Sequence, residues 1–240
     1  MRRRSVLLIL LVGLAQGLSA SVLASSSQAE AFAETREAMS LSPDPENGLV
    51  VYEVCAACHG PEGWGNAKGT YAQIAGQHPK VLIKQLADIR ALNRDNPAMY
   101  PFSVPEAIGG AQAVADVTAY IANLPMDPDH GTGPWSEGTY EYNQGEKLYQ
   151  ARCAHCHGLN GEGSDASLFP RIQGQHFEYM LRQFEWIRDG KRRNANPAMV
   201  EQAKGFNDRE SQMVINYVTH LPVPKEDSAL SPNWKNPDLD

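Results

Sequence analysis

The sequence predicts an all-α protein made of two similar domains in tandem. The 240-residue chain repeats at an offset of 98: CAACHG at 55–60 corresponds to CAHCHG at 153–158, and IAGQH at 74–78 corresponds to IQGQH at 172–176. An offset of this size is the length of a small domain and is too long for a solenoid repeat. Apolar residues recur at helical spacing, and no segment shows the strict alternation of a strand.

Each half carries three segments with helical spacing. The first leads into a cysteine motif, and the third is followed by Leu-Pro, which stops a helix. The stretches between these segments are long for a compact domain, which indicates that something besides side chains fills each core. The expected helices are 46–57, 79–92 and 111–123 in the first half and 142–155, 177–189 and 208–220 in the second.

The N-terminal residues 1–29 have the pattern of a secretory signal peptide. MRRR provides the basic start, an apolar run follows, and small-residue cleavage sites lie between positions 20 and 29. We therefore expect export to the periplasm. The alternative is an uncleaved membrane anchor, because residues 5–24 carry no charge and are just long enough to span a bilayer.

Composition marks the other boundaries. Residues 126–139 are rich in Pro, Gly and Asp and lack an apolar period, so we expect a surface linker between a domain at 40–125 and a domain at 140–222. Residues 223–240 have a similar composition and are the expected C-terminal tail. This tail is either pinned to a domain by Trp234 or a frayed, exposed end.

The charge of the chain limits the class of partner. The formal net charge is −7, and loss of the three leader arginines changes it to −7 − 3 = −10. Such a chain is a poor match for nucleic acid, because phosphate contacts need clusters of Lys and Arg. An acidic protein favours instead a partner that presents a basic docking surface.

All four cysteines lie in two C-x-x-C-H motifs, which are the signature of c-type haem attachment. Two thiols about one helical turn apart can each add to a vinyl group of one porphyrin, and the adjacent histidine then binds the iron. A zinc site, a thioredoxin-like dithiol and a pair of structural disulfides are the alternatives, but none explains a histidine after both pairs. The motif residues are Cys55, Cys58 and His59 in the first half and Cys153, Cys156 and His157 in the second.

A haem iron bound by one histidine has a sixth coordination position to fill. The motif NPAM occurs twice and ends in Met99 and Met199, each in a proline-set loop outside the expected helices. Ligation by histidine and methionine is the cytochrome c pattern and raises the reduction potential. The rival ligands are His78 and His176, which also recur, but a helix begins immediately after each and leaves little slack. Otherwise we expect these two histidines at partly exposed helix starts.

Other recurring residues are candidates for contacts around the haem. A metal-binding histidine usually donates its second ring N–H to a carbonyl or carboxylate, which fixes the ring. The carbonyls of Ala72 and Pro170 hold equivalent positions and are the expected acceptors. Arg90 and Arg188 also recur, and they either pair with haem propionates or lie on a solvated helix face.

CAACHG, AGQH, NPAM and the closing helix followed by Leu-Pro resemble the dihaem cytochrome c4 family over about residues 45–222. The resemblance implies two tandem class I cytochrome c domains, each wrapped around a covalent haem c, in a pseudo-twofold arrangement. It also implies His/Met ligation at both irons and a role as electron carrier to a terminal oxidase or similar acceptor. The departures from the family pattern are Ala72, where proline is usual, the longer segment 100–110 and the C-terminal tail.

The expected function is therefore that of a periplasmic dihaem protein that shuttles single electrons between respiratory donors and a terminal oxidase or reductase. It catalyses no bond chemistry of its own. Its partners are redox proteins, and association with a membrane oxidase is possible. Two alternatives stay open from the sequence: a dihaem electron-accepting subunit of a periplasmic dehydrogenase complex, and a haem enzyme with one open iron site. The sequence is compatible with a monomer or a partner-bound subunit.

Overall fold

The computed structural model describes residues 28–239, and these fold into helices without a single named strand. Backbone pairing outside helices is limited to two isolated bridges in this range, Met126 with Ser228 and Ser164 with Phe169. The all-α prediction is confirmed. The expected leader at 1–29 lies almost wholly outside the described residues. None of the helices within residues 28–239 is both long and apolar enough to cross a bilayer.

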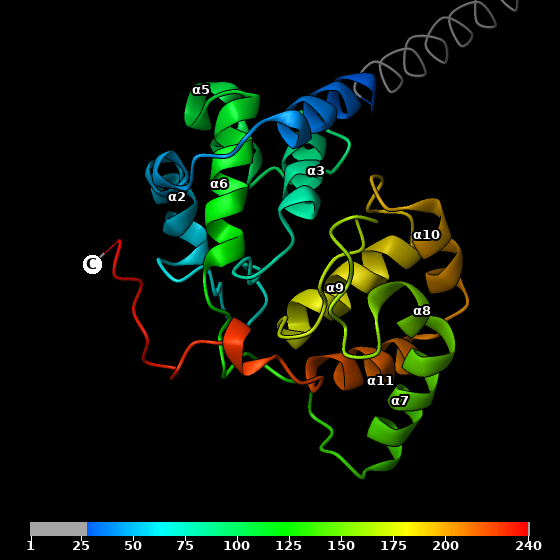
Figure 1. The fold of residues 1–240 in the computed structure, drawn as a ribbon. Helices are drawn as coiled ribbons and strands as arrows, with labels where there is room; N and C mark the ends of the chain where they lie inside the picture. The colour runs from blue at the N-terminus through cyan, green and yellow to red at the C-terminus, as the bar shows by residue number, and fades with distance from the viewer. Residues whose placement is uncertain (1–27, 240) are drawn as a thin grey trace, which may run out of the picture.

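The helices fall into a first half (28–125) and a second half (140–222), which form the two lobes seen in Figure 1. The first half contains a helix at 28–40, α2 (Pro45–His59), α3 (Pro79–Arg90), α4 (Tyr100–Ser103), α5 (Pro105–Ile108) and α6 (Ala111–Asn123). The second half contains α7 (Tyr140–Arg152), α8 (Ala154–His157), α9 (Phe177–Arg188), α10 (Pro197–Lys204) and α11 (Asp208–Thr219). A short 3-10 helix, η1 (Lys225–Asp227), follows in the C-terminal tail.

A close helix pair forms the frame of each half: α2 with α6, and α7 with α11. Glycine allows the approach, because a Cβ at Gly48 would lie 2.3 Å from the Asp116 carbonyl oxygen and one at Gly145 would lie 2.1 Å from that of Met213. A fully buried tyrosine on α2 and another on α7 fill the two cores. All six expected helices are present, with ends that differ by a few residues.

The helix at 28–40 was not expected from the sequence. Its Ala38 is buried in the first-half core, and Arg90 of α3 forms an ion pair with Glu34. The sequence signal was weak here because the helix follows directly on the apolar leader and is largely exposed.

The linker is less exposed than its composition suggested. Met126 is only 3% exposed, and the backbones of Met126 and Asp227 are hydrogen-bonded at 2.8 Å. Further along, the Asn216 side chain pairs with both backbone groups of Trp135, each at 2.8 Å. Tertiary contacts with the second half and with the tail therefore anchor this segment at particular residues, while the rest of it lies on the surface as expected.

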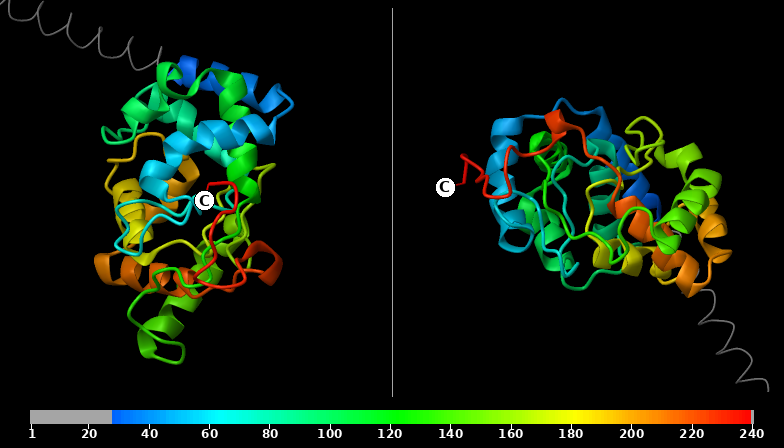
Figure 2. Two further views of the ribbon diagram at one scale, coloured as in Figure 1. Left: turned by 90° about the vertical axis from the view of Figure 1, so that its left-hand side faces the viewer. Right: turned by 90° about the horizontal axis from the view of Figure 1, so that it is seen from below.

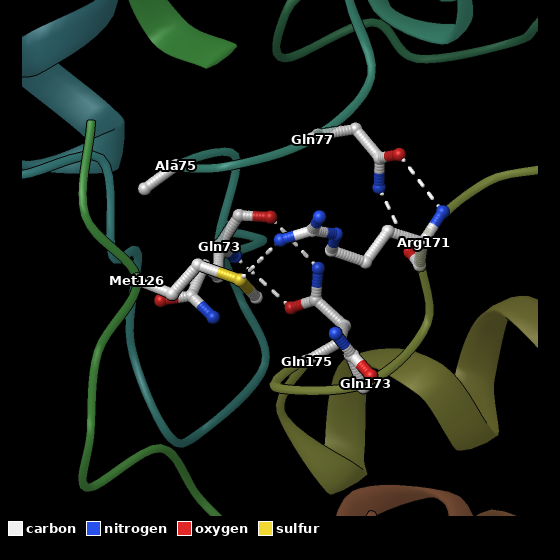
Figure 3. Close-up of a pocket in the computed structure, with 7 residues that line it drawn as sticks. All are labelled: Gln73, Ala75, Gln77, Met126, Arg171, Gln173 and Gln175. Atoms are coloured by element: carbon white, nitrogen blue, oxygen red, sulfur yellow. Dashed lines mark hydrogen bonds between the residues drawn. The ribbon is translucent and has the colours of Figure 1, made fainter. Parts of the chain in front are cut away.

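The two halves hold each other through a reciprocal pair of glutamines (Figure 3). Gln77 donates to the Arg171 carbonyl at 2.8 Å and accepts from the Arg171 N–H at 3.0 Å. Gln175, its repeat counterpart, does the same to Gln73 with the same two distances. Because 73 and 171, like 77 and 175, differ by the repeat offset, this contact has the self-complementary form of a twofold interface.

The recurring histidines take part in the same interface. His78 Nε2 lies 2.8 Å from the Glu162 carbonyl, and His176 Nε2 lies 2.6 Å from the Trp64 carbonyl. His176 also accepts from the Gly131 N–H through Nδ1 and is 2% exposed. The expectation of a partly exposed helix start is thus wrong for His176. Both rings are committed across the boundary between the halves, which leaves them unsuited to the rival role of iron ligands.

We predict that Gln175→Ala destabilises the protein by about 2 kcal/mol or more, because it leaves both backbone groups of Gln73 buried without partners. Denaturant unfolding of the purified protein measures this. Gln150→Ala is the matched control, since Gln150 makes only an exposed hydrogen bond to Glu146 and should cost less than about 0.5 kcal/mol. Equal costs for the two variants would contradict the role of the glutamine pair.

Candidate haem-binding sites

The four cysteines lie at equivalent helix ends. Cys55 and Cys58 are in the last two turns of α2, whereas Cys153 stands between α7 and α8 because the second-half helix breaks there. No disulfide joins these cysteines. Burial raises the pKa of Cys55 to about 12 and that of Cys153 to about 11, so neither is a thiolate near pH 7. A low thiolate content disfavours the exchange chemistry of a thioredoxin-like dithiol, which needs a thiolate.

The motif histidines are enclosed and fixed in orientation. His59 Nδ1 lies 2.8 Å from the Ala72 carbonyl oxygen, and His157 Nδ1 lies 3.1 Å from that of Pro170. Both acceptors predicted from the sequence are confirmed. Burial lowers the pKa of each histidine, so the neutral imidazole is the stable form. Within the described residues neither Nε2 has a hydrogen-bond partner, which leaves it free to bind a metal.

A glycine loop closes each site behind the histidine. The N–H of Gly65 donates to the His59 carbonyl at 2.8 Å, and the N–H of Gly163 donates to that of His157 at 2.7 Å. Both glycines have positive φ, and a Cβ at Gly65 would lie 2.5 Å from the Ala72 carbonyl oxygen. The loop can therefore press against the histidine's acceptor only with glycine at this position.

The repeated methionines lie against the same cores as the cysteines. Met99 packs on the first-half core together with Cys55, and Met199 packs on the second-half core together with Cys153. Met99 precedes α4, as expected for a loop residue, but Met199 lies in the first turn of α10. The loop prediction for Met199 is wrong because Asn196 caps a helix at this point, accepting from the Ala198 N–H at 2.8 Å.

The two recurring arginines, candidates for either propionate pairing or a solvated helix face, are occupied by protein groups. Arg90 pairs with Glu34 and donates to two backbone carbonyls, and Arg188 pairs with Asp189 and Asp208. Neither is therefore positioned as a free cation for a haem carboxylate.

A different arginine pair lies half-buried between the halves. Arg94 donates to Gln85 at 3.0 Å and to Gln183 at 3.3 Å, and Arg192 donates to the same two amides at 2.9 and 3.0 Å. Arg94 and Arg192 differ by the repeat offset, as do Gln85 and Gln183. The recurrence of these residues in both repeats was a sequence signal for the cluster, and the prediction of site residues missed it. Within the described residues neither arginine has a carboxylate at ion-pair distance.

Charge in this arginine cluster is poorly compensated. Burial, with Arg94 close by, lowers the pKa of Arg192 to about 10. Burial alone would raise the pKa of Tyr179, but the neighbouring arginines outweigh it and the pKa falls. Tyr179 accepts a hydrogen bond from Arg94 at 2.9 Å. Asp88 offsets part of this charge, but two close, half-buried cations still favour negatively charged groups nearby, so the cluster fits a site for such groups.

A zinc site needs three or four ligand side chains in one place. In the range 28–239 no three His, Cys, Asp or Glu side chains gather in this way. The donor set of each half fits a c-type haem instead: a thiol pair, a neutral imidazole with a free Nε2, and a methionine on the same core.

Comparison with known proteins agrees with this geometry. Residues 45–125 match the family described as "Cytochrome c", and residues 141–218 match "Cytochrome C oxidase, cbb3-type, subunit III". A cytochrome c4 from Thiocapsa roseopersicina is 34% identical over 184 residues, which cover 74% of this chain and 93% of the relative. A thiosulfate dehydrogenase electron acceptor from Stutzerimonas stutzeri is 32% identical, covering 70% of this chain and 78% of the relative. The crystal structure of reduced cytochrome c4 from Pseudomonas stutzeri superposes with a TM-score of 0.64 at 28% identity, covering 75% of this chain and all of that one.

The fold and its two sites define a tandem c-type cytochrome, an electron carrier that holds two haems c covalently through its cysteine pairs. Within that class, the chain belongs to the dihaem cytochrome c4 family.

We predict that Gly65→Ala costs more than about 2 kcal/mol of stability, because the new Cβ meets the Ala72 carbonyl and the backbone requires positive φ. Denaturant unfolding of the haem-loaded protein measures the loss. Gly110→Ala is the control, since a Cβ there has nothing within 4 Å and φ is −83°. A Gly65→Ala protein as stable as the control variant would show that the loop does not need glycine.

Proposed function

We propose that the protein carries single electrons in the periplasm between respiratory donors and a terminal oxidase or reductase. The observation that carries this proposal is the matched construction of the two sites. In each half the methionine packs on the same core as the first cysteine of the motif, whose histidine is fixed and neutral, so Met99 and Met199 are suited to be the second iron ligands beside His59 and His157. Two filled axial positions favour electron transfer over substrate chemistry at iron.

The haem and the protein residues have different roles in electron transfer. A covalent haem supplies one-electron chemistry, because its iron is stable as both Fe(II) and Fe(III). The chain's part is to keep the imidazole from rotating, through the Ala72 and Pro170 carbonyls, and to limit water with the packed core around the cysteines. A fixed first coordination sphere changes little between oxidation states, which is what rapid electron transfer requires.

The cluster of Arg94 and Arg192 would hold the haem carboxylates. Haem carboxylates are the negatively charged groups that each half must accommodate, and Arg94 and Arg192 are half-buried cations with no ion-pair partner among residues 28–239. Each arginine bonds an amide from both halves, so the cluster lies between the two sites. We assign these arginines, in place of Arg90 and Arg188, to the haem propionates.

The electron donor and acceptor are expected to be redox proteins. A net charge of −7, or −10 without the leader arginines, supports docking on a basic surface, with rates that fall as ionic strength rises. The match of residues 141–218 to a family described as an oxidase subunit supports an oxidase as one such partner.

A second candidate role is that of electron-accepting subunit of a periplasmic dehydrogenase. The relative named as a thiosulfate dehydrogenase electron acceptor supports it. Purification of the native protein at low salt separates the two roles: a dehydrogenase that stays bound in a fixed ratio supports the subunit role, and a free protein supports the carrier.

We predict that Met99→Ala and Met199→Ala each remove about half of the weak Met–iron absorption band and lower the reduction potential of one haem, because the thioether favours Fe(II). A redox titration with spectra measures both effects. Met180→Ala is the control, since Met180 also packs on the second-half core but is not repeated. An unchanged band in either ligand variant would contradict the assignment for that half.

We predict that Arg192→Gln lowers the haem reduction potentials, because losing a half-buried positive charge makes Fe(III), the more positive state, easier to form. Arg209→Gln, which removes the same charge from an exposed ion pair with Glu141, is the control and should shift them far less. Potentials come from the same titration. Equal shifts of the potentials in the two variants would show that the arginine cluster does not lie at the haem sites.

A further inference from the structure

The C-terminal segment 224–239 leaves the second half and ends on the first (Figures 1 and 2). Its start is anchored between the halves: Asp227 pairs with Arg171 at 2.8 Å, and the Ala229 N–H donates to the Met126 carbonyl at 2.9 Å. The segment lies outside the residues that match either cytochrome family, which end at 218. It is therefore an addition to the two-domain frame, and it is ordered by specific contacts.

The far end of this segment covers the loop directly after the first Cys-x-x-Cys-His motif. The Trp234 ring lies 5.9 Å from that of Trp64, centroid to centroid. Asn236, only 2% exposed, donates to the Pro61 carbonyl at 2.8 Å. Lys235 pairs with Glu62 at 3.1 Å. Three consecutive residues thus bind the few residues that follow His59.

Additional contacts fix this end to the body of the first half. Asn236 also donates to the Tyr120 hydroxyl at 2.9 Å, and that hydroxyl donates to Asp238 at 3.1 Å. Leu239 packs against the first-half core. The segment is held at both ends, so we call residues 224–239 the C-terminal strap.

The second half has no such cover. Repeat counterparts of Pro61, Glu62 and Trp64 lie 98 residues later, at Leu159, Asn160 and Glu162. All three are exposed, and Leu159 is 74% exposed. The residues that receive the strap are thus absent from the second half, and the loops after the two motif histidines differ in their exposure to water.

We propose that the strap is a positioning element that raises the reduction potential of the first haem above the value its site would otherwise have. Two physical effects act in the same direction. Excluding water from the loop after His59 disfavours Fe(III), the more highly charged state. Lys235 neutralises Glu62, whose side chain is only 10% exposed and whose bare carboxylate would favour Fe(III). The inference rests on the proposed ligation by His59.

Three variants test the strap, with the two haems followed separately through their haem-methyl proton resonances during a redox titration. A chain ending at Ala229 and the variant Lys235→Ala should both lower the potential of the first haem and leave the second nearly unchanged. Glu62→Gln in the Lys235→Ala background should recover most of the loss, because it removes the carboxylate that has lost its partner. Lys225→Ala is the matched control: it changes the same charge on an exposed residue of the same strap and should shift neither haem selectively.

A second readout separates water exclusion from charge. Amide hydrogen exchange at residues 60–65 should speed up in the chain ending at Ala229, and Trp234→Phe should restore most of the protection that Trp234→Ala loses. Equal shifts of both haems, or no shift in Lys235→Ala, would overturn the proposal. Haem content and the Met–iron band are recorded for every variant. A wrong ligand assignment would then be detected from these two measurements, separately from any effect of the strap on the potentials.

Discussion

The imidazole rings of His59 and His157 set the constraint on which each half depends. An axial imidazole must be neutral, buried and unable to rotate, and burial alone would leave its second nitrogen without a partner. A backbone carbonyl, from Ala72 or Pro170, resolves this conflict in each half. The carbonyl is positioned by a glycine loop that folds back on the histidine, and the helix ahead of the ring is held by a second glycine at its contact with the closing helix. Helix, loop and acceptor therefore form one unit around each ring.

The repeat in the sequence serves a second purpose at the contact between the halves. Gln77 and Gln175 each form a matching pair of hydrogen bonds with the backbone of the other half. His78 and His176 follow the same pattern, because each ring lies against a backbone carbonyl of the other half. Two similar halves can meet around a pseudo-twofold axis, so a residue that occurs at the same position of both repeats makes the same contact twice. The symmetry is broken where the strap covers the first site alone. A symmetric frame with one asymmetric addition is a simple way to make two similar redox sites unequal.

Residue patterns predicted much of this structure because the signals were local. Helical spacing placed the six main helices, and the cysteine motif with its histidine identified the cofactor and the acceptor carbonyls. Two of the errors arose where distant contacts decide the outcome, and the third where a local helix cap was overlooked. Arg90 looked available in sequence, but a glutamate from the unexpected N-terminal helix binds it. Met199 was placed in a loop, although a local cap starts a helix there. His176 was expected near the surface but is buried by the other half.

By itself, the sequence determined the duplication, the helical class, the two covalent haems and the candidate ligands, because each depends on spacing within a short segment. The tertiary structure alone decided which repeated residues face the other half. It also showed that Arg94 and Arg192 share one half-buried cluster and that the last residues of the chain return to the first site. These features join groups that lie 84 to 175 residues apart in the chain. Periodicity and motif spacing carry no information on such pairs, since they arise only when the folded halves pack together.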